Sequence, residues 1–204
     1  VRLERELSAA VQEGQFVLHY QPVVSLPSGR LEGVEALVRW NHPERGLLPP
    51  GEWLDVAEES RLMPELGTWI LEEATRQAAQ WYRRWADAAP FVHVNISPAQ
   101  LRPGFDERVA ELLERFGLPG ELLVLELTEQ QFERPTASLL RWFETLRPSG
   151  VQLAIDDFGT GYNSLTHVTD LAVDVIKLDR QFVSAMHHDD RAMAVVQAVI
   201  GMSQ

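Results

Sequence analysis

Short runs of apolar residues alternate along this chain with longer stretches in which apolar residues recur every three or four positions. The short runs are typical of strands, and the recurring positions are typical of amphipathic helices. The pattern predicts six strands, at residues 16–24, 31–40, 91–96, 122–127, 151–155 and 173–178. It predicts helices at residues 3–13, 50–59, 65–85, 105–116, 136–146 and 192–202, with short helical turns after residue 178.

The order of these elements indicates an α/β fold. The turn Pro27-Ser28-Gly29 joins the first two strands, whereas most of the later strands are followed by a helical segment. Strands that alternate with helices form a parallel sheet with right-handed crossovers. No internal repeat, low-complexity tract or linker interrupts the pattern, so we expect one domain.

Composition narrows the possible functions. The 204 residues are 45% hydrophobic and 24% charged, which is ordinary for a globular domain. The absence of cysteine excludes disulfides, zinc–thiolate sites and thiol catalysis. No apolar stretch approaches the roughly 20 residues that span a bilayer. A net charge of -12 argues against a long nucleic acid as partner, although cations could bridge a small anionic substrate to the carboxylates.

A polar residue or pair terminates each of four successive predicted strands: Asn95, Glu126, Asp156 with Asp157, and Lys177. The carboxyl ends of parallel strands lie on one face of an α/β fold, where catalytic residues gather. Glu35 joins this set, because an acid inside an apolar strand is costly to bury without a partner. Taken singly, each would more often be a turn residue or a satisfied core acid. Together they predict a metal-binding rim.

The aspartate pair allows two interpretations when it is taken alone. Adjacent carboxylates repel each other unless a cation or hydrogen-bond donors hold them together. They can also accept backbone N–H groups in an Asx turn. Neighbouring side chains on a strand point to opposite faces, so Asp156 and Asp157 can share a cation only where the strand ends and the glycine-rich residues 158–165 begin.

Lys177 is the only lysine, since the other seventeen basic residues are arginine. An ammonium can shift its pKa, whereas a guanidinium stays charged. A single lysine at the end of an apolar strand therefore indicates a chemical role that arginine cannot fill. The alternative is a surface lysine placed there by chance.

These residues and their neighbours resemble the EAL domain family of bacterial cyclic di-GMP phosphodiesterases. The resemblance runs in order along almost the whole chain. It is carried by Tyr20-Gln21-Pro22, Glu35-Ala36-Leu37 with residues 38–43, Val94-Asn95-Ile96-Ser97, Glu126-Leu127-Thr128-Glu129, residues 156–165 and Lys177-Leu178-Asp179.

The resemblance implies a TIM-like (β/α) barrel in which a strand near the N-terminus runs antiparallel to the others, as the short first turn allows. A TIM barrel has eight strands and about 250 residues. We therefore expect residues 1–204 to form an EAL-type phosphodiesterase domain that is truncated at its C-terminal end and lacks about the last two βα units. In this family, the later part supplies a glutamate to the second metal.

The implied reaction is two-metal hydrolysis of cyclic di-GMP to linear pGpG with Mg²⁺ or Mn²⁺. By motif, Glu35, Asn95, Glu126 and Asp156 would ligate one ion, and Asp156 and Asp157 the second. Lys177 would orient or deprotonate the attacking water, if burial and the cations depress its pKa. The expected catalytic residues are Lys177, Asp157 and Glu35.

Further roles follow from the resemblance alone. Arg39 would hold a phosphate and Gln21 would contact the substrate. Glu129 would stabilise the glycine-rich loop, to which Gly159 and Gly161 give conformational freedom. The domain would be cytoplasmic, in a parent protein that can be membrane-anchored, beside a diguanylate cyclase-like or sensory domain. Homodimerisation is a further expectation.

Two other function classes stay open. The first is a catalytically incompetent module that binds cyclic di-GMP or regulates a partner. The second is an unrelated TIM-barrel enzyme that shares a carboxylate rim.

Some residues depart from the family pattern or attract a weaker interpretation. Arg61 stands where glycine is common, Asn163 replaces a serine and Ala172 replaces a proline. Residues 187–190 are predicted to be a solvated helix cap, despite two histidines and two aspartates. His42 and His93 lack a companion at ligand spacing and are predicted packing residues, and Trp69, Trp81 and Trp85 are predicted core or interface residues.

Overall fold

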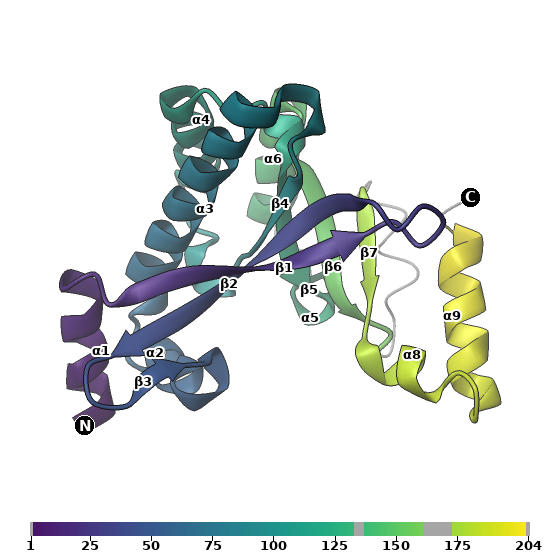
Figure 1. Cartoon of the computed structure of the whole chain (residues 1–204), viewed down its shortest axis with the longest axis horizontal. Helices are drawn as coiled ribbons and strands as arrows, with labels where there is room; N and C mark the ends of the chain where they lie inside the picture. The colour runs from purple at the N-terminus through teal and green to yellow at the C-terminus, as the bar shows by residue number, and fades with distance from the viewer. Residues whose placement is uncertain (1, 133–136, 161–172, 203–204) are drawn as a thin grey trace.

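The computed structural model describes residues 2–132, 137–160 and 173–202, and Figure 1 shows their arrangement. One mixed sheet has the strand order β1-β2-β4-β5-β6-β7, and the short β3 pairs with the C-terminal end of β2. The strands are β1 (Phe16–Val24), β2 (Leu31–His42), β3 (Gly46–Leu48), β4 (Phe91–Asn95), β5 (Leu123–Thr128), β6 (Gln152–Phe158) and β7 (Val175–Leu178).

The helices alternate with the later strands, as predicted. They are α1 (Arg2–Gln12), α2 (Leu54–Glu59), α3 (Met63–Trp85), α4 (Phe105–Phe116), α5 (Glu129–Phe132), α6 (Ala137–Leu146), α8 (Arg180–Ala185) and α9 (Asp190–Met202). In Figure 1, α3, α4 and α6 form a row of neighbouring helices, and α3 packs on β4. Within the described residues, no helix is both long and apolar enough to cross a membrane.

The antiparallel pair of β1 and β2 confirms the prediction made from the first turn. Their register sets Gln21 opposite Glu35. The turn closes through hydrogen bonds from Ser25 N–H to the Arg30 carbonyl and from Gly29 N–H to the Ser25 carbonyl. The pairs β2-β4, β4-β5, β5-β6 and β6-β7 are parallel. Sequence reasoning missed β3, which pairs with the far end of β2 from Trp40 to His42.

The alternation of side chains divides the parallel strands into two faces. Val92 and Val94 on β4 lie beside Leu123 and Leu125 on β5, and all four are at most 1% exposed. These residues belong to the apolar core beneath the helices. The residues that alternate with them along the strands, among them His93 and Glu126, therefore point to the opposite face of the sheet.

The prediction that the fifth strand ends at residue 155 was wrong. β6 continues through Asp156 and Asp157 to Phe158, which is 3% exposed. The pairing of β6 with β7 shifts register between Ile155 and Phe158, and Asp157 has a φ of 55°. This irregularity acts as a bulge, which redirects one side chain without ending the strand. The carboxylates therefore separate inside a strand, and not in the loop that follows.

The helix predicted over residues 50–59 is divided. A 3-10 turn spans Pro50–Glu52, and α2 begins only at Leu54. Trp53 between them has a non-helical ψ of -14° with a φ of -148°, and its side chain is 1% exposed. Burial of this indole in the core fixes the break.

Candidate functional site

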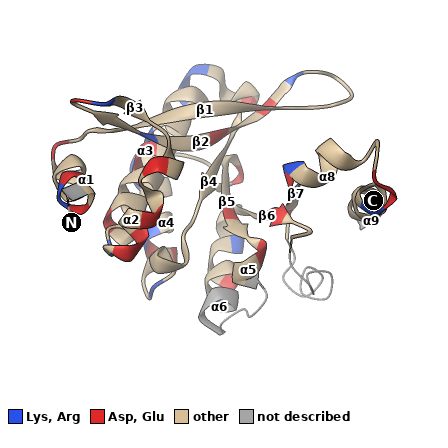
Figure 2. Ribbon diagram, turned by 90° about the horizontal axis from the view of Figure 1, so that it is seen from below, with Lys and Arg blue, Asp and Glu red and all other residues tan. Residues whose placement is uncertain are grey.

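Five polar residues from five neighbouring strands lie on the same face of the sheet. The register pairs Glu35 on β2 with His93 on β4, and Asn95 on β4 with Glu126 on β5. Ala154 pairs with both Glu126 and Val175, so Asp156 and Lys177, two residues further along β6 and β7, share that face. Figure 2 shows acidic positions on β5 and β6 beside a basic position on β7. The predicted rim therefore forms from Glu35, Asn95, Glu126, Asp156 and Lys177.

Three carboxylates of this rim can hold a metal ion. One oxygen from each of Glu35, Glu126 and Asp156 lies within 4.8 Å of the others. The Glu126 side chain is fully buried, whereas those of Glu35 and Asp156 are 18% and 22% exposed. Carboxylate oxygens suit hard cations such as Mg²⁺ and Mn²⁺. The cluster therefore presents the chemistry of a divalent cation site that opens to solvent on one side.

The ammonium of Lys177 lies among these carboxylates. Its Nζ is 2.6 Å from Oε2 of Glu126, 3.1 Å from Oε2 of Glu35 and 3.2 Å from Oδ2 of Asp156. Burial opposes the charge on Lys177, but the attraction of Glu126, its hydrogen bond and the other two carboxylates together raise the pKa of the ammonium. The ammonium thus occupies the place where the three carboxylates would bind a cation. The residues therefore fit a metal ion.

Without bound cations, burial alone does not depress the pKa of Lys177. Three carboxylates surround the ammonium and stabilise its charge more than burial destabilises it. Lys177 is therefore an ion-pair partner of the cluster, and a role as base would require the carboxylates to be neutralised by another cation.

Asn95 supports the cluster from β4. Its side-chain amide donates from Nδ2 to Oε1 of Glu35 over 2.9 Å. The amide group is thereby oriented, and its acceptor oxygen remains available next to the carboxylates.

His93 is buried, as predicted for a packing residue, and it also contacts the carboxylate cluster. It is 7% exposed, and its Nδ1 lies 2.8 Å from Oε1 of Glu126. The signal in the sequence was the spacing along the strand, because a residue two positions before Asn95 shares its face. The partner of His93 lies on the next strand, where spacing along the sequence does not reveal it.

Asp157 does not join the three-carboxylate cluster. Its backbone N–H donates to Oδ1 of Asp156 over 3.0 Å, while its own side chain is exposed on the bulge. Partial burial raises the pKa of Asp157, and the negative charges of Asp156 and Asp179 raise it further against the effect of Lys177. The two aspartates therefore occupy different environments, as a pair serving two cation positions would require.

Glu129 contacts the start of the glycine-rich segment. The side chain is buried, and its Oε2 accepts hydrogen bonds from Gly159 N–H at 2.9 Å and from the Thr160 hydroxyl at 3.4 Å. Gly159 has a φ of 100°, and a Cβ there would lie 2.7 Å from the ring of Phe182. Both features require glycine at position 159. Gly161, Asn163 and Ala172 lie outside the described residues.

The predicted substrate residues lie on the same face of the hairpin. Gln21 is exposed and lies opposite Glu35 across the antiparallel pair. Arg39, two positions beyond Leu37 on the face of Glu35, donates from Nη1 to the carbonyl of Val38 over 2.8 Å. Neither residue contacts the three-carboxylate cluster through a side-chain hydrogen bond.

The remaining predictions concern residues away from the rim. Residues 187–190 are exposed, and Oδ1 of Asp189 accepts from Arg191 N–H, which confirms a helix cap. His42 is buried and its Nδ1 accepts from the backbone N–H groups of Glu44 and Arg45, so it organises the turn into β3. Trp69 and Trp81 pack against the core, whereas Trp85 is 45% exposed.

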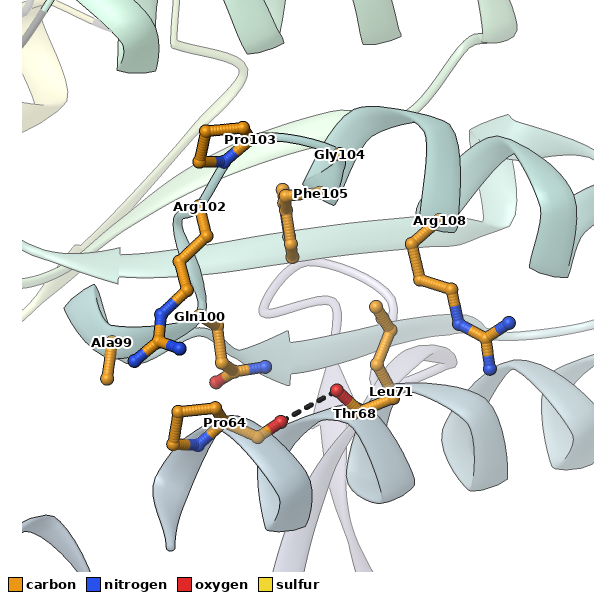
Figure 3. Close-up of a pocket in the computed structure, with 10 residues that line it drawn as sticks. All are labelled: Pro64, Thr68, Leu71, Ala99, Gln100, Arg102, Pro103, Gly104, Phe105 and Arg108. Atoms are coloured by element: carbon orange, nitrogen blue, oxygen red, sulfur yellow. Dashed lines mark hydrogen bonds between the residues drawn. The ribbon is translucent and has the colours of Figure 1, made fainter. Parts of the chain in front are cut away.

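A separate hollow lies between α3 and the start of α4 (Figure 3). Its volume is about 190 Å³, and its wall includes Thr68, Gln100 and Phe105. It lies beside helices, and none of its lining residues belongs to the cluster on the sheet. The candidate metal-binding residues therefore lie on the rim and not in this hollow.

Comparison with known proteins identifies the family of this chain. Residues 4–204 match the EAL domain. Two relatives come from Pseudomonas aeruginosa: the bifunctional diguanylate cyclase/cyclic di-GMP phosphodiesterase MucR, 38% identical over 208 residues, and the cyclic di-GMP phosphodiesterase NbdA, 37% identical over 205 residues. All of this chain is covered in both comparisons, but it spans only 30% of MucR and 26% of NbdA.

A solved structure shares the fold closely. The PaMucR phosphodiesterase in complex with c-di-GMP matches with a TM-score of 0.91 and 39% sequence identity, over 98% of this chain and 81% of that one. The FimX EAL domain from Pseudomonas aeruginosa bound to c-di-GMP matches with a TM-score of 0.86 and 25% identity, over 99% of this chain and 81% of that one. The α/β fold with its antiparallel β1-β2 pair therefore matches the TIM-like barrel of these structures.

Proposed function

The chain belongs to the EAL domain family, and from this premise we propose that it hydrolyses cyclic di-GMP to linear pGpG with divalent cations. The observation that carries the proposal is the cluster of Glu35, Glu126 and Asp156, whose ligand oxygens lie within 4.8 Å of one another. The relatives named as cyclic di-GMP phosphodiesterases support the choice of substrate.

In this proposal Glu35, Asn95, Glu126 and Asp156 hold one Mg²⁺ or Mn²⁺ ion, and Asp156 and Asp157 contribute to a second. Such cations supply charge that stabilises the phosphoryl oxygens and lowers the pKa of a bound water. Asn95 orients Glu35 through its amide hydrogen bond. Asp156 serves both positions, because its two oxygens already face different partners, Lys177 and the N–H of Asp157.

The chain's other residues bind and orient the substrate. Lys177 positions the attacking water, and the neutralisation of its three carboxylate partners would remove the attraction that now raises its pKa. Arg39 binds a phosphate through its guanidinium, which donates to the Val38 carbonyl among the described residues. Gln21 contacts the substrate from its place opposite Glu35.

The test is a turnover assay with cyclic di-GMP and Mn²⁺ or Mg²⁺, with the products separated by anion-exchange chromatography. We expect pGpG, and we expect Glu35→Ala to abolish its formation. Glu32→Ala is the matched control, because Glu32 is an exposed acid on the same strand that points to the other face. Turnover that persists in Glu35→Ala would contradict the metal assignment.

A binding module is the second outcome that the assay distinguishes. The FimX EAL domain has been solved bound to c-di-GMP, so an EAL domain of this fold can be isolated with the intact ligand. Binding of cyclic di-GMP in calorimetry without any pGpG would favour that function over hydrolysis.

We further propose that the chain is one EAL-type unit of a longer cytoplasmic or membrane-anchored protein, beside a diguanylate cyclase-like or sensory domain. The small share of MucR and NbdA that the chain spans supports this arrangement. The prediction that residues 1–204 lack about two βα units is tested by comparing turnover of this chain with turnover of a longer one. Sedimentation of both chains tests homodimerisation.

A further inference from the structure

His93 occupies a buried position directly beneath the carboxylate cluster. It lies on β4 between Glu35 of β2 and Val124 of β5 in the register. Gly33 on the neighbouring strand borders the ring, since a Cβ at that position would lie at a contact distance of 3.4 Å from Nε2 of His93. The same Cβ would lie 3.2 Å from the Phe91 carbonyl oxygen. The imidazole, which is 7% exposed, therefore packs against the neighbouring strand.

The two oxygens of Glu126 have different partners. Oε1 lies 2.8 Å from Nδ1 of His93, and Oε2 lies 2.6 Å from Nζ of Lys177. An ionised carboxylate accepts hydrogen bonds and donates none, so the contact with an ionised Glu126 assigns the ring proton of His93 to Nδ1. Because the Glu126 side chain is fully buried, water does not replace either partner.

We propose that His93 is a positioning residue for the divalent cation of the proposed phosphodiesterase. By holding Oε1, it leaves only Oε2 of Glu126 facing Glu35 and Asp156, so that Glu126 ligates through a single oxygen. The inference rests on the proposed function, since it concerns the same cation. Hydrogen-bond partners of metal ligands fix the ligand's orientation, and their loss typically weakens metal binding by about 10- to 100-fold.

The test is calorimetric titration of the protein with Mn²⁺ alone, without substrate. We expect His93→Ala to weaken Mn²⁺ binding by about 10- to 100-fold. His93→Asn should stay within roughly threefold of the unmodified protein, because its Nδ2 is as many bonds from Cβ as Nδ1 of histidine is. His93→Gln places its donor one bond further out and should bind Mn²⁺ as weakly as His93→Ala.

The comparison of Asn with Gln separates positioning from a general loss of packing. Both variants are polar, and their melting temperatures show whether either is misfolded. Val92→Ala is the control for a truncated side chain in the same strand, because Val92 is buried on the helix-facing side. It should lower the melting temperature and leave Mn²⁺ affinity unchanged.

The outcomes distinguish failure of the positioning role from failure of the metal site. Unchanged Mn²⁺ affinity in His93→Ala, or equal affinity in the Asn and Gln variants, would overturn the role of His93 while the metal site stands. No Mn²⁺ binding by the unmodified protein would overturn both proposals. Restored binding in His93→Asn alone would support the positioning role.

Discussion

The Nζ of Lys177 lies 2.6 Å from Oε2 of Glu126, in contact with a carboxylate whose side chain is fully buried. The same ammonium bridges Glu35 and Asp156 at 3.1 and 3.2 Å. Three carboxylates that would otherwise repel one another are thus held together by one positive charge. A divalent cation bound by these oxygens would compete with the ammonium, so the effects of the two on stability would be linked.

Lys177→Met should expose this competition. Without the ammonium, and with a chelator present, we expect the free energy of unfolding to fall by about 2 to 4 kcal/mol, because the buried carboxylate of Glu126 loses its charged partner. Addition of Mn²⁺ should then raise the melting temperature more than it does for the unmodified protein. Thermal unfolding with chelator and with Mn²⁺ measures both effects.

Arg180→Met is the matched control for the loss of one positive charge. Arg180 is exposed and lies three residues further along the chain, outside the cluster. It should change neither the stability in chelator nor the response to Mn²⁺ by more than a few tenths of a kcal/mol. If Lys177→Met and the unmodified protein are equally stable in chelator, the three contacts of the ammonium contribute nothing to the free energy of unfolding.

Asp157→Asn should stabilise the metal-free protein near neutral pH. Burial and the charges of Asp156 and Asp179 raise the pKa of Asp157, so its ionised form is disfavoured in the folded state. The gain should be at most about 1 kcal/mol, because water screens this exposed side chain. The left-handed backbone at this position accepts asparagine as readily as aspartate.

The pH dependence follows from the direction of that shift. The penalty on the ionised form is complete above the raised pKa of the folded state, and it disappears below the unfolded value of about 3.9. The gain from Asp157→Asn should therefore be largest near pH 7 and should vanish as the pH falls toward 4. Urea unfolding across this range, with the exposed Asp87→Asn as control, checks it. A gain that persists in acid would contradict the electrostatic explanation.

Much of the rim could be predicted because the sheet register follows from the alternation of side chains. Once Glu35, Asn95, Glu126 and Asp156 were placed on strands, parallel pairing brought them to one face. The contacts of Lys177 could not be predicted, because they depend on how far a flexible side chain reaches across neighbouring strands. The pairing of β7 with β6, which are distant in sequence, determines which carboxylates the Lys177 side chain can contact.

Two features of the fold were missed for physical reasons. β3 is only three residues long and is stabilised by pairing with β2, so its own sequence carries little signal. β6 continues through two aspartates, which are depleted in strands, because the bulge at Asp157 and the buried Phe158 keep it in the sheet. Tertiary contacts override local preference at both places.

Gly67→Ala should show strong coupling to Gln100. Gly67 lies inside α3, where alanine normally gains about 1 kcal/mol over glycine. Here a Cβ would lie only 2.2 Å from the side-chain carbon Cδ of Gln100, whose Oε1 accepts from Ser97 N–H at 2.9 Å. The new methyl group would displace the amide seen in Figure 3 and leave that N–H without its acceptor.

A double-mutant cycle with Gln100→Ala measures this coupling by chemical unfolding. Gly67→Ala should be close to neutral alone, and it should be stabilising by about 1 kcal/mol once Gln100 is alanine. Gly51→Ala is a control glycine, because nothing lies within 4 Å of the place that its new methyl group would take. Additive effects of Gly67→Ala and Gln100→Ala would rule out the contact as the reason for glycine.

Arg61→Gly should stabilise the protein. Arg61 stands where glycine is common in the family, and its backbone conformation favours glycine. Arg61 has a φ of 58°, and it follows α2 at the left-handed position of a Schellman motif. The motif is closed by bonds from Leu62 N–H to the Ala57 carbonyl and from Arg61 N–H to the Glu58 carbonyl. A left-handed L-residue costs roughly 1–2 kcal/mol, which the greater flexibility of glycine in the unfolded chain partly offsets.

We therefore expect a net gain of about 0.5 to 1 kcal/mol for Arg61→Gly, measured by urea unfolding. Arg61→Ala removes the same exposed side chain but keeps the Cβ, so it should give no such gain. Ser60→Gly, at a neighbouring residue with a φ of -81°, should destabilise the protein instead. Equal stability of Arg61→Gly and Arg61→Ala would mean that the backbone at position 61 is unstrained.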